Sequence, residues 1–315
     1  MLRIGVLGVG YLGKIHMQVL RELPELYSEV KFFDPDIKAA KEAAAQFGIE
    51  PCHSIDALID EVDVVDVVST TSAHYHCAAS AIRNFKHVFI EKPVTTSLEE
   101  SERLIKLAKE AQIIAQVGHI ERFNPAFQSV APHLNRVQYI ECQRLNQFHG
   151  RNTDISVVTD LMIHDIDLIL SLTKANVRRI SATGASVLSN QIDIANARIE
   201  LDNGCVANLT ASRIASERSR KMRFYQKDAC YVSDFLNKSA YVYERDTNAE
   251  FPEMVKRELL VQDINALKLE LETFGTAVLA QHEPLVTLDD GHRALAVAEM
   301  IQEKIRMSVF TTPDE

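Results

Sequence analysis

The stretch Leu2-Arg-Ile-Gly-Val-Leu-Gly-Val-Gly-Tyr-Leu-Gly-Lys-Ile-His16 decides the fold expected for this chain of 315 residues. An apolar run, Ile4 to Leu7, predicts a buried strand and leads directly into the pattern Gly8-x-Gly10-x-x-Gly13. The residues that follow have the apolar spacing of a helix. Strand, glycine turn and helix in this order are the context of a dinucleotide-binding fingerprint.

Each glycine has its own physical role in such a turn. Gly8 permits the tight turn, Gly10 lets the backbone approach a pyrophosphate, and Gly13 lets the helix pack closely on the strand. The unpaired amides at the start of the helix then face the phosphates. A second apolar strand ends at Asp34, about twenty residues past the last glycine, where a carboxylate accepts hydrogen bonds from a ribose 2′-hydroxyl and repels a 2′-phosphate. The pattern therefore favours NAD over NADP.

Composition limits the function classes. The net charge is −10, with 46% hydrophobic and 25% charged residues, which is ordinary for a soluble globular protein. The acidic balance argues against binding to nucleic acid or anionic membranes, and no apolar run reaches membrane-spanning length. The five cysteines are scattered and form no Cys-x-x-Cys pair. We therefore expect reduced thiols, no metal site and a cytoplasmic protein.

Strands and helices alternate from residue 1 to about residue 118, which predicts a parallel sheet with helices on both faces. The β-branched run Asp63-Val-Val-Asp-Val-Val68 is typical of a central strand in such a sheet. Ligands bind at the carboxyl ends of these strands. The residues expected to contact the cofactor are Gly8, Gly10, Tyr11, Leu12, Gly13, Asp34, Ser69, Thr70, Thr71, His74, Glu91 and Lys92.

The pattern changes after Gly118. Strand-like runs dominate residues 136–244, Asn203-Gly204 predicts a hairpin turn, and one helix over residues 156–172 interrupts the strands. Two amphipathic helices are expected over residues 264–281 and 289–306. We expect an α/β Rossmann domain over residues 1–118 and an α+β domain over residues 119–315. The second has an open, mostly antiparallel sheet, and the last helix packs back on the first domain.

Lys92 is the first candidate for chemistry. It lies in Glu91-Lys92-Pro93, directly after a buried strand at the nucleotide-facing edge of the sheet. A lysine there hydrogen-bonds a substrate hydroxyl and stabilises a developing alkoxide. The alternative is a surface lysine before a proline turn.

The second candidate is the segment Asp160-Leu-Met-Ile-His164-Asp-Ile-Asp167, within the helix of the second domain. Asp160, His164 and Asp167 share one helix face at this spacing. An aspartate oriented against a histidine gives a proton acceptor with a defined tautomer. A solvated helix face and a zinc site are the alternatives. The metal is disfavoured because no further His/Cys cluster is evident.

These motifs together resemble one enzyme family. Gly8-x-Gly10-x-x-Gly13-x-x-His16, the segment from Ser69 to Tyr75, Glu91-Lys92-Pro93 and Asp160-x-Met162-x-His164-x-x-Asp167 look like the glucose–fructose oxidoreductase / inositol dehydrogenase / MocA family. The resemblance covers nearly the whole chain. It implies NAD(P)-dependent chemistry at a sugar or polyol carbon, with Lys92, Asp160 and His164 catalytic, and a homodimer or homotetramer formed through the open sheet.

The chain departs from the family pattern at two places. Met162 stands where the family often has glycine, which implies a narrower substrate pocket, and Ser69-Thr70 replaces a common Thr-Pro. Within the family, residues 118–125 and 160–167 look most like the UDP-N-acetylglucosamine 3-dehydrogenase branch. Residues expected to contact a nucleotide-sugar on that basis are Arg122, Asn124, His149, Asp160 and His164, with Arg151 the weakest candidate.

The resemblance implies that His164 takes the hydroxyl proton, Lys92 holds the oxygen and Asp160 orients His164. Whether Lys92 or His164 carries the proton stays open at this point. Two other functions also stay open. One is a non-catalytic sensor of NAD(H) or a sugar nucleotide, and the other is an imine or enone reductase.

Overall fold

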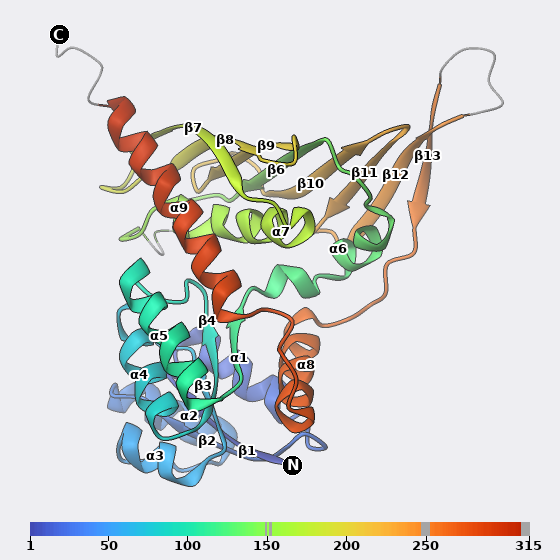
Figure 1. The fold of residues 1–315 in the computed structure, drawn as a ribbon. Helices are drawn as coiled ribbons and strands as arrows, with labels where there is room; N and C mark the ends of the chain where they lie inside the picture. The colour runs from blue at the N-terminus through green and yellow to red at the C-terminus, as the bar shows by residue number, and fades with distance from the viewer. Residues whose placement is uncertain (149, 151–152, 247–252, 310–315) are drawn as a thin grey trace. The chain divides into compact units, whose positions relative to one another are not determined.

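The computed structural model describes residues 1–148, 150, 153–246 and 253–309. The chain divides into two compact units (Figure 1). The first comprises Met1–Ile120 and Asn265–His292, and the second Glu121–Ile264 and Arg293–Glu315. The first division falls two residues after the expected boundary at 118. The chain returns to the first unit at Asn265, so this unit is built from two separate stretches of sequence.

The first unit is built on a five-stranded parallel sheet of order β2-β1-β3-β4-β5, as the alternating pattern predicted. Its strands are β1 Leu2–Leu7, β2 Tyr27–Phe33, β3 Val64–Val67, β4 His87–Glu91 and β5 Ala115–Gly118. Its helices are α1 Tyr11–Leu20, α2 Ile37–Phe47, α3 Ile55–Glu61, α4 Thr71–Arg83, α5 Leu98–Ala111 and α8 Ala266–Ala280. The strand order reverses between β1 and β3, which is where ligands bind in sheets of this kind.

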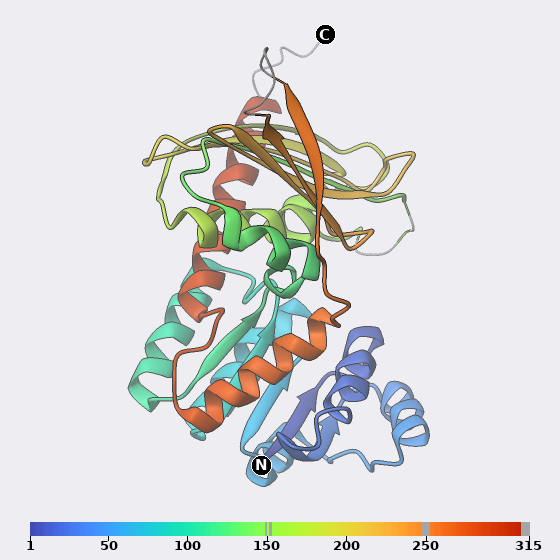
Figure 2. The same cartoon turned by 90° about the vertical axis from the view of Figure 1, so that its right-hand side faces the viewer.

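Helices cover both faces of this sheet. One face packs against α1, α2 and α8 in a cluster that includes Ile4, Phe32 and Phe274, and Figure 2 shows α8 crossing in front of the strands. On the opposite face Gly5 lies against Leu58 of α3, because a Cβ at this glycine would come within 2.2 Å of the leucine side chain. The helix ends also follow local rules. Gly48 adopts the left-handed conformation, with φ 68°, directly after α2, as expected for a C-terminal glycine.

The second unit is built on an eight-stranded sheet of order β13-β12-β11-β10-β6-β9-β8-β7. Its strands are β6 Tyr139–Leu145, β7 Val177–Ala185, β8 Ile194–Leu201, β9 Val206–Ser212, β10 Ser219–Gln226, β11 Ala229–Asp234, β12 Ser239–Arg245 and β13 Met254–Leu259. The neighbours pair antiparallel except for β6 with β9. The predicted mostly antiparallel sheet is confirmed. The edge strand β13 was not predicted, because its exposed, charged pattern carries no apolar alternation.

One face of this sheet forms the core of the second unit. Alternate residues along β8, such as Ala195, Ala197 and Ile199, are buried, and they belong to a cluster that also contains Ile166 and Phe127. The helical segments of this unit are η1 Ile120–Phe123, α6 Pro125–Val130, η2 Ala131–His133, η3 Val158–Met162 and α7 Ile163–Thr173, and the long helix α9 Leu288–Val309 begins in the first unit. Within the described residues no helix combines the length and hydropathy needed to cross a bilayer.

Candidate functional site

The glycine turn after β1 has the geometry that its spacing requires. Gly8 has a φ of 100°, and a Cβ added there would lie 2.9 Å from the backbone nitrogen of Ser69. A Cβ at Gly13 would lie 2.0 Å from the carbonyl oxygen of Gly8. At Gly10, in contrast, an added Cβ would meet nothing within 4 Å. Two of the glycines are therefore needed by the protein itself, whereas Gly10 leaves space for a ligand.

A cavity of about 670 Å³ opens beside this turn. Helix α1 begins at its edge, and no side chain caps the first turn of that helix. The amides at the start of the helix present partial positive charge, which suits a pyrophosphate. Predicted cofactor residues that line the cavity are Gly8, Gly10, Tyr11, Leu12, Asp34, Ser69 and Thr70. Gly13, Thr71, His74, Glu91 and Lys92 are not among the residues that line it.

Asp34 connects the end of β2 with the glycine turn. Its Oδ2 accepts a hydrogen bond from the amide of Val9 at 2.7 Å, and its Oδ1 accepts one from the amide of Asp36 at 2.8 Å. The carboxylate is half-buried and lines the cavity. An oriented carboxylate in this place suits a ribose diol and repels a 2′-phosphate. The geometry agrees with the preference for NAD that the sequence indicates.

Nine further residues that line the cavity were not predicted as cofactor contacts. They come from the ends of the first three strands, the loop after β2, the start of α3 and the first half of α4: Leu7, Phe33, Pro35, His53, Ser54, Ile55, Val68, Ala73 and Cys77. No motif marks them, because they come from several separate elements and only the fold brings them to one wall. Most are apolar or small, as expected for a wall that packs against a flat ring system.

His74 has a different position from the one expected. Its ring is buried, with Nδ1 2.9 Å from the carbonyl oxygen of Pro93 and Nε2 3.1 Å from that of Ser69. Burial lowers the pKa of His74. The imidazole thus connects the loop after β3 with the residue that follows Lys92. Lys92 itself is half-buried at the carboxyl end of β4.

In the second unit, the predicted helix over residues 156–172 contains an irregular first turn. Residues Val158–Met162 form a π-helical turn, and the regular helix α7 begins at Ile163. Such turns occur frequently at functional sites. Between residues 156 and 170, all of which the structure describes, only Thr159, Asp160 and His164 are not buried. Asp160 and His164 are therefore the two ionisable side chains of this stretch that are partly exposed.

Asp167, in contrast, is not exposed. It is buried and accepts two hydrogen bonds from Arg122, with Nε to Oδ2 at 2.8 Å and Nη2 to Oδ1 at 2.6 Å. His164 and Asp167 both lie in the regular helix α7, three residues apart, whereas the π-helical turn lies before them and changes the register of Asp160. Asp167 differs from the other two in being buried and paired with Arg122.

A second buried arginine lies beside this helix. Arg144 of β6 donates to Asp165 Oδ1 from Nη2 at 2.7 Å and to Glu121 Oε1 from Nη1 at 2.6 Å, and all three side chains are buried. Burial alone would lower the pKa of Arg144, but the two carboxylates outweigh it and raise that pKa. None of these three residues was a predicted site residue. Their signal in the sequence is only a charged residue at a core position.

The predicted substrate residues are already engaged in different ways. Arg122 uses two of its nitrogen atoms on Asp167, and Asn124 caps α6 by accepting from the amide of Ala126 at 3.1 Å while donating to Glu121 at 3.0 Å. Arg122 therefore joins η1 to α7, and Asn124 stabilises the start of α6. His149, like Arg151, lies outside the described residues. Met162 is fully buried within the core of the second unit.

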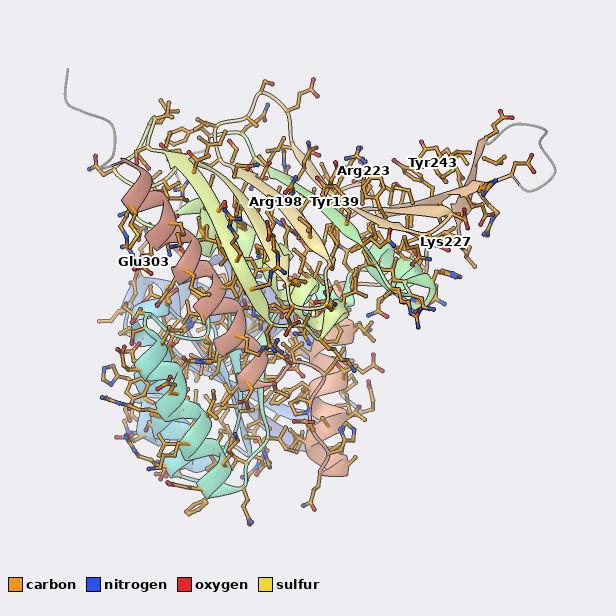
Figure 3. The ribbon with its side chains drawn as sticks, turned by 45° about the horizontal axis from the view of Figure 1, so that its top comes forward. Tyr139, Arg198, Arg223, Lys227, Tyr243 and Glu303 are labelled. Carbon is orange, nitrogen blue, oxygen red and sulfur yellow. The ribbon has the colours of Figure 1, made fainter. Side chains whose placement is uncertain are left out.

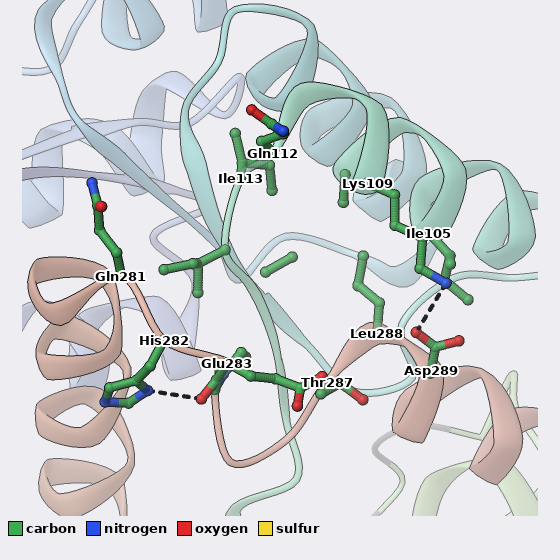
Figure 4. A pocket seen from close by; sticks show the side chains of 14 residues that line it. Ile105, Lys109, Gln112, Ile113, Gln281, His282, Glu283, Thr287, Leu288 and Asp289 are labelled. Carbon is green, nitrogen blue, oxygen red and sulfur yellow. Dashed lines mark hydrogen bonds and ion pairs between the residues drawn. The ribbon is translucent and has the colours of Figure 1, made fainter.

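The first unit has another hollow, of about 280 Å³, between the end of α5, β5 and the loop before α9 (Figure 4). An ion pair between Lys109 and Asp289, 3.8 Å long, lies at its rim, and His282 Nδ1 lies 2.9 Å from the carbonyl oxygen of Glu283. No predicted site residue lines this hollow. In the described part of the chain no three His, Cys, Asp or Glu side chains gather as a metal site would need.

Two family models match the chain. Residues 2–119 match an oxidoreductase family with an NAD-binding Rossmann fold, and residues 116–231 match the GFO/IDH/MocA C-terminal domain. The protein is thus an NAD-binding oxidoreductase, in agreement with the glycine turn, the uncapped helix and Asp34. It belongs to the GFO/IDH/MocA family, as the four motifs of the sequence predicted.

Known proteins resemble the chain over its whole length. It is 36% identical over 312 residues to UDP-N-acetylglucosamine 3-dehydrogenase of Acidithiobacillus ferrooxidans, covering 98% of each chain. A solved structure of that enzyme has a TM-score of 0.92 over 97% of this chain and 98% of its own. The chain is 31% identical to scyllo-inositol 2-dehydrogenase (NAD(+)) of Bacillus subtilis, covering 67% of each. A levoglucosan dehydrogenase complex with NADH, 18% identical with a TM-score of 0.86 over 97% of both chains, shares the fold.

Proposed function

We propose that this enzyme oxidises the 3-hydroxyl of UDP-N-acetylglucosamine with NAD. The observation that carries the proposal is the full-length similarity to an enzyme of that name, at 36% identity over 98% of both chains. The partial exposure of Asp160 and His164 on an otherwise buried helix supports it, because oxidation of an alcohol needs a group that takes the hydroxyl proton. A sensor of NAD(H) needs no such group.

Different residues of this chain bind the cofactor and act on the substrate. Gly10 and the start of α1 hold the pyrophosphate of the cofactor, and Asp34 holds its adenosine ribose. Bound NAD supplies an acceptor for the hydride that leaves the sugar carbon. His164 takes the hydroxyl proton, Asp160 favours the resulting imidazolium by its negative charge, and Lys92 stabilises the oxygen as negative charge develops on it.

The first experiment separates binding from turnover. The variants Lys92→Met and His164→Ala are each measured for NAD binding and for NADH formation with UDP-N-acetylglucosamine. Each change is expected to lower kcat by about 10² to 10⁴, with NAD affinity retained because neither residue lines the cofactor cavity. The matched controls are Lys109→Met and His76→Ala, both at exposed positions. Full turnover in both catalytic variants would refute these roles.

The second experiment tests the substrate. Initial rates of NADH formation are compared for UDP-N-acetylglucosamine, UDP-glucose and scyllo-inositol, since relatives act on a sugar nucleotide and on an inositol. We expect the highest kcat/KM with UDP-N-acetylglucosamine. A higher value with the inositol would move the proposal to a polyol substrate. No NADH from any alcohol, but turnover of an imine or enone, would favour the reductase.

The same proposal covers assembly and location. The outer face of the second sheet carries aromatic and charged residues, among them the half-buried Tyr139 and Arg223 and the exposed Tyr243 (Figure 3), and we infer that this face joins subunits into a dimer or tetramer. A sedimentation experiment that finds a monomer at assay concentration would contradict this. All five cysteines are free, which supports a cytoplasmic enzyme.

A further inference from the structure

His16 is a fully buried histidine that the proposed chemistry does not use. It lies on α1, three residues after Gly13, and its exposed fraction is 0%. Its Nδ1 is 2.9 Å from Oδ2 of Asp66, a buried residue of the central strand β3. Its Nε2 is 3.3 Å from Oε1 of Glu91 at the end of β4. One imidazole therefore connects three neighbouring elements of the first unit.

This geometry favours a charged ring. Nδ1 is hydrogen-bonded to Asp66, and Nε2 lies 3.3 Å from a carboxylate oxygen of Glu91 in an ion-pair contact without hydrogen-bond geometry, so both carboxylates favour the imidazolium. Burial alone would lower the pKa of His16, but the two carboxylates outweigh it and raise the pKa to about 10. The positive charge is shared between Asp66 and Glu91, and it offsets the cost of burying two carboxylates side by side.

Glu91 contacts both His16 and the backbone of Lys92. While its Oε1 faces His16, its Oε2 accepts the backbone amide of Lys92 at 3.1 Å. The carboxylate also lies against Gly118 on β5, where an added Cβ would come within 2.7 Å of Oε1. The backbone amide of Lys92 is thus hydrogen-bonded to Oε2 of a carboxylate whose other oxygen, Oε1, lies close to both the His16 ring and the backbone of Gly118.

We propose that His16 is a positioning residue for Lys92. Through its imidazolium it holds the Glu91 carboxylate in the orientation that accepts the Lys92 amide, and it thereby sets where the Lys92 side chain leaves the sheet. The inference rests on the proposed function of Lys92. It adds a residue that touches neither substrate nor cofactor, and whose loss lowers turnover without removing a reacting group.

Apolar packing alone would not need this arrangement. Replacing a buried ion network by apolar side chains of similar volume is often neutral or stabilising, and Phe89 already packs its ring edge against His16, with ring centres 5.9 Å apart. What an apolar residue cannot do is orient a carboxylate. A charged histidine at this place is therefore explained by the direction that it imposes on Glu91.

The first test needs no substrate. In protein labelled with ¹⁵N at histidine, both ring nitrogens of His16 are expected to show imidazolium shifts at about pH 8, well above the ordinary histidine pKa of about 6.5. His16→Gln assigns the signal. A neutral ring at that pH would overturn the inference, whatever the enzyme's substrate is.

The second test follows the Lys92 amide by hydrogen exchange in the NAD-bound enzyme. Loss of the imidazolium frees Glu91 to rotate, so exchange at Lys92 is expected to be about tenfold faster or more in His16→Gln, since the local opening becomes easier. The control is Val19→Ala, a buried change on the same helix. Unchanged exchange in His16→Gln, or an equal increase in Val19→Ala, would overturn the inference.

The third test is a double-mutant cycle on turnover. His16→Gln and Glu91→Gln are each expected to lower kcat on the order of 10²-fold, the cost of misplacing a catalytic group by about an ångström. The double variant should be no slower than the slower single variant, because both changes break one connection. Additive losses would mean that His16 does not act through Glu91. If His16→Gln does not fold, Glu91→Gln carries the kinetic and exchange measurements alone.

These results separate the inference from the proposed function. If the wild-type enzyme does not oxidise UDP-N-acetylglucosamine, the substrate proposal fails, and the cycle is run on the alcohol that does react. If Lys92→Met is fully active, the role of Lys92 fails, and the positioning inference fails with it. If Lys92→Met is inactive while His16→Gln keeps wild-type kcat, only the inference fails.

Discussion

The glycine turn and helix α7 hold their candidate residues in place by opposite means. Around the glycine turn, side chains are missing: Gly13 is in contact with the backbone of Gly8, and Gly10 leaves the start of α1 open. Around α7, charged side chains are buried in pairs, such as Arg144 with Asp165 and Glu121. A site of the first kind is damaged by adding atoms. A site of the second kind is damaged by removing charges.

The largest expected effect tests the charged region. Arg144→Met keeps much of the side-chain volume but leaves the buried carboxylates of Asp165 and Glu121 without their partner. We expect it to lower the free energy of unfolding by about 3–5 kcal/mol, measured by urea denaturation. The control Arg198→Met removes an exposed arginine and should cost less than about 1 kcal/mol. Equal losses at the two positions would contradict the stabilising role of buried charge beside α7.

The next effect tests the glycine turn. Gly13→Ala forces a Cβ to within 2.0 Å of the Gly8 carbonyl oxygen, so we expect a loss of about 1–3 kcal/mol in unfolding free energy, as for other overpacked sites. Gly10→Ala meets no atom and has an ordinary φ of −63°. It should leave stability within about 0.5 kcal/mol and weaken NAD binding, measured by calorimetry. A Gly10→Ala variant that binds NAD normally would show that the backbone does not approach the cofactor there.

The last prediction concerns how the free energy of unfolding depends on pH, through the buried charge of His16 in the first unit. Because the pKa of His16 is raised from 6.5 to about 10, its stabilising contribution is complete below pH 6.5 and is lost as the pH rises toward 10. Between these limits the folded state binds one more proton than the unfolded state. Stability should therefore fall by up to about 1.4 kcal/mol per pH unit. Urea denaturation across this range should show a shallower fall in His16→Gln than in the wild-type protein.

Much of the fold could be predicted because local signals and tertiary structure agree. The parallel sheet of the first unit and the mostly antiparallel sheet of the second were both predicted, and Gly204 makes the predicted turn between β8 and β9 with a φ of 86°. The π-helical turn at Val158–Met162 was not predicted. Its residues are compatible with an ordinary helix, so only the packing of the second unit reveals the extra residue.

The candidate site was predictable to the extent that it rests on backbone geometry. Asp34 and the glycines could be identified because a turn and a strand end restrict which residue types are possible. The wall that includes Ile55 and Cys77 could not be identified, because apolar residues at element ends have many uses. Similarly, nothing in the sequence distinguished the buried Asp167, which pairs with Arg122, from the partly exposed Asp160.

The sequence by itself determined that this protein is an NAD-binding oxidoreductase of the GFO/IDH/MocA family, because glycine spacing and strand–helix order are properties of short segments. Only the tertiary structure decided which charges neutralise one another. The partners of Arg144, Arg122 and His16 are 21 or more residues away along the chain. Electrostatic interactions depend on distance in space and on burial, and neither quantity is encoded in any single stretch of sequence.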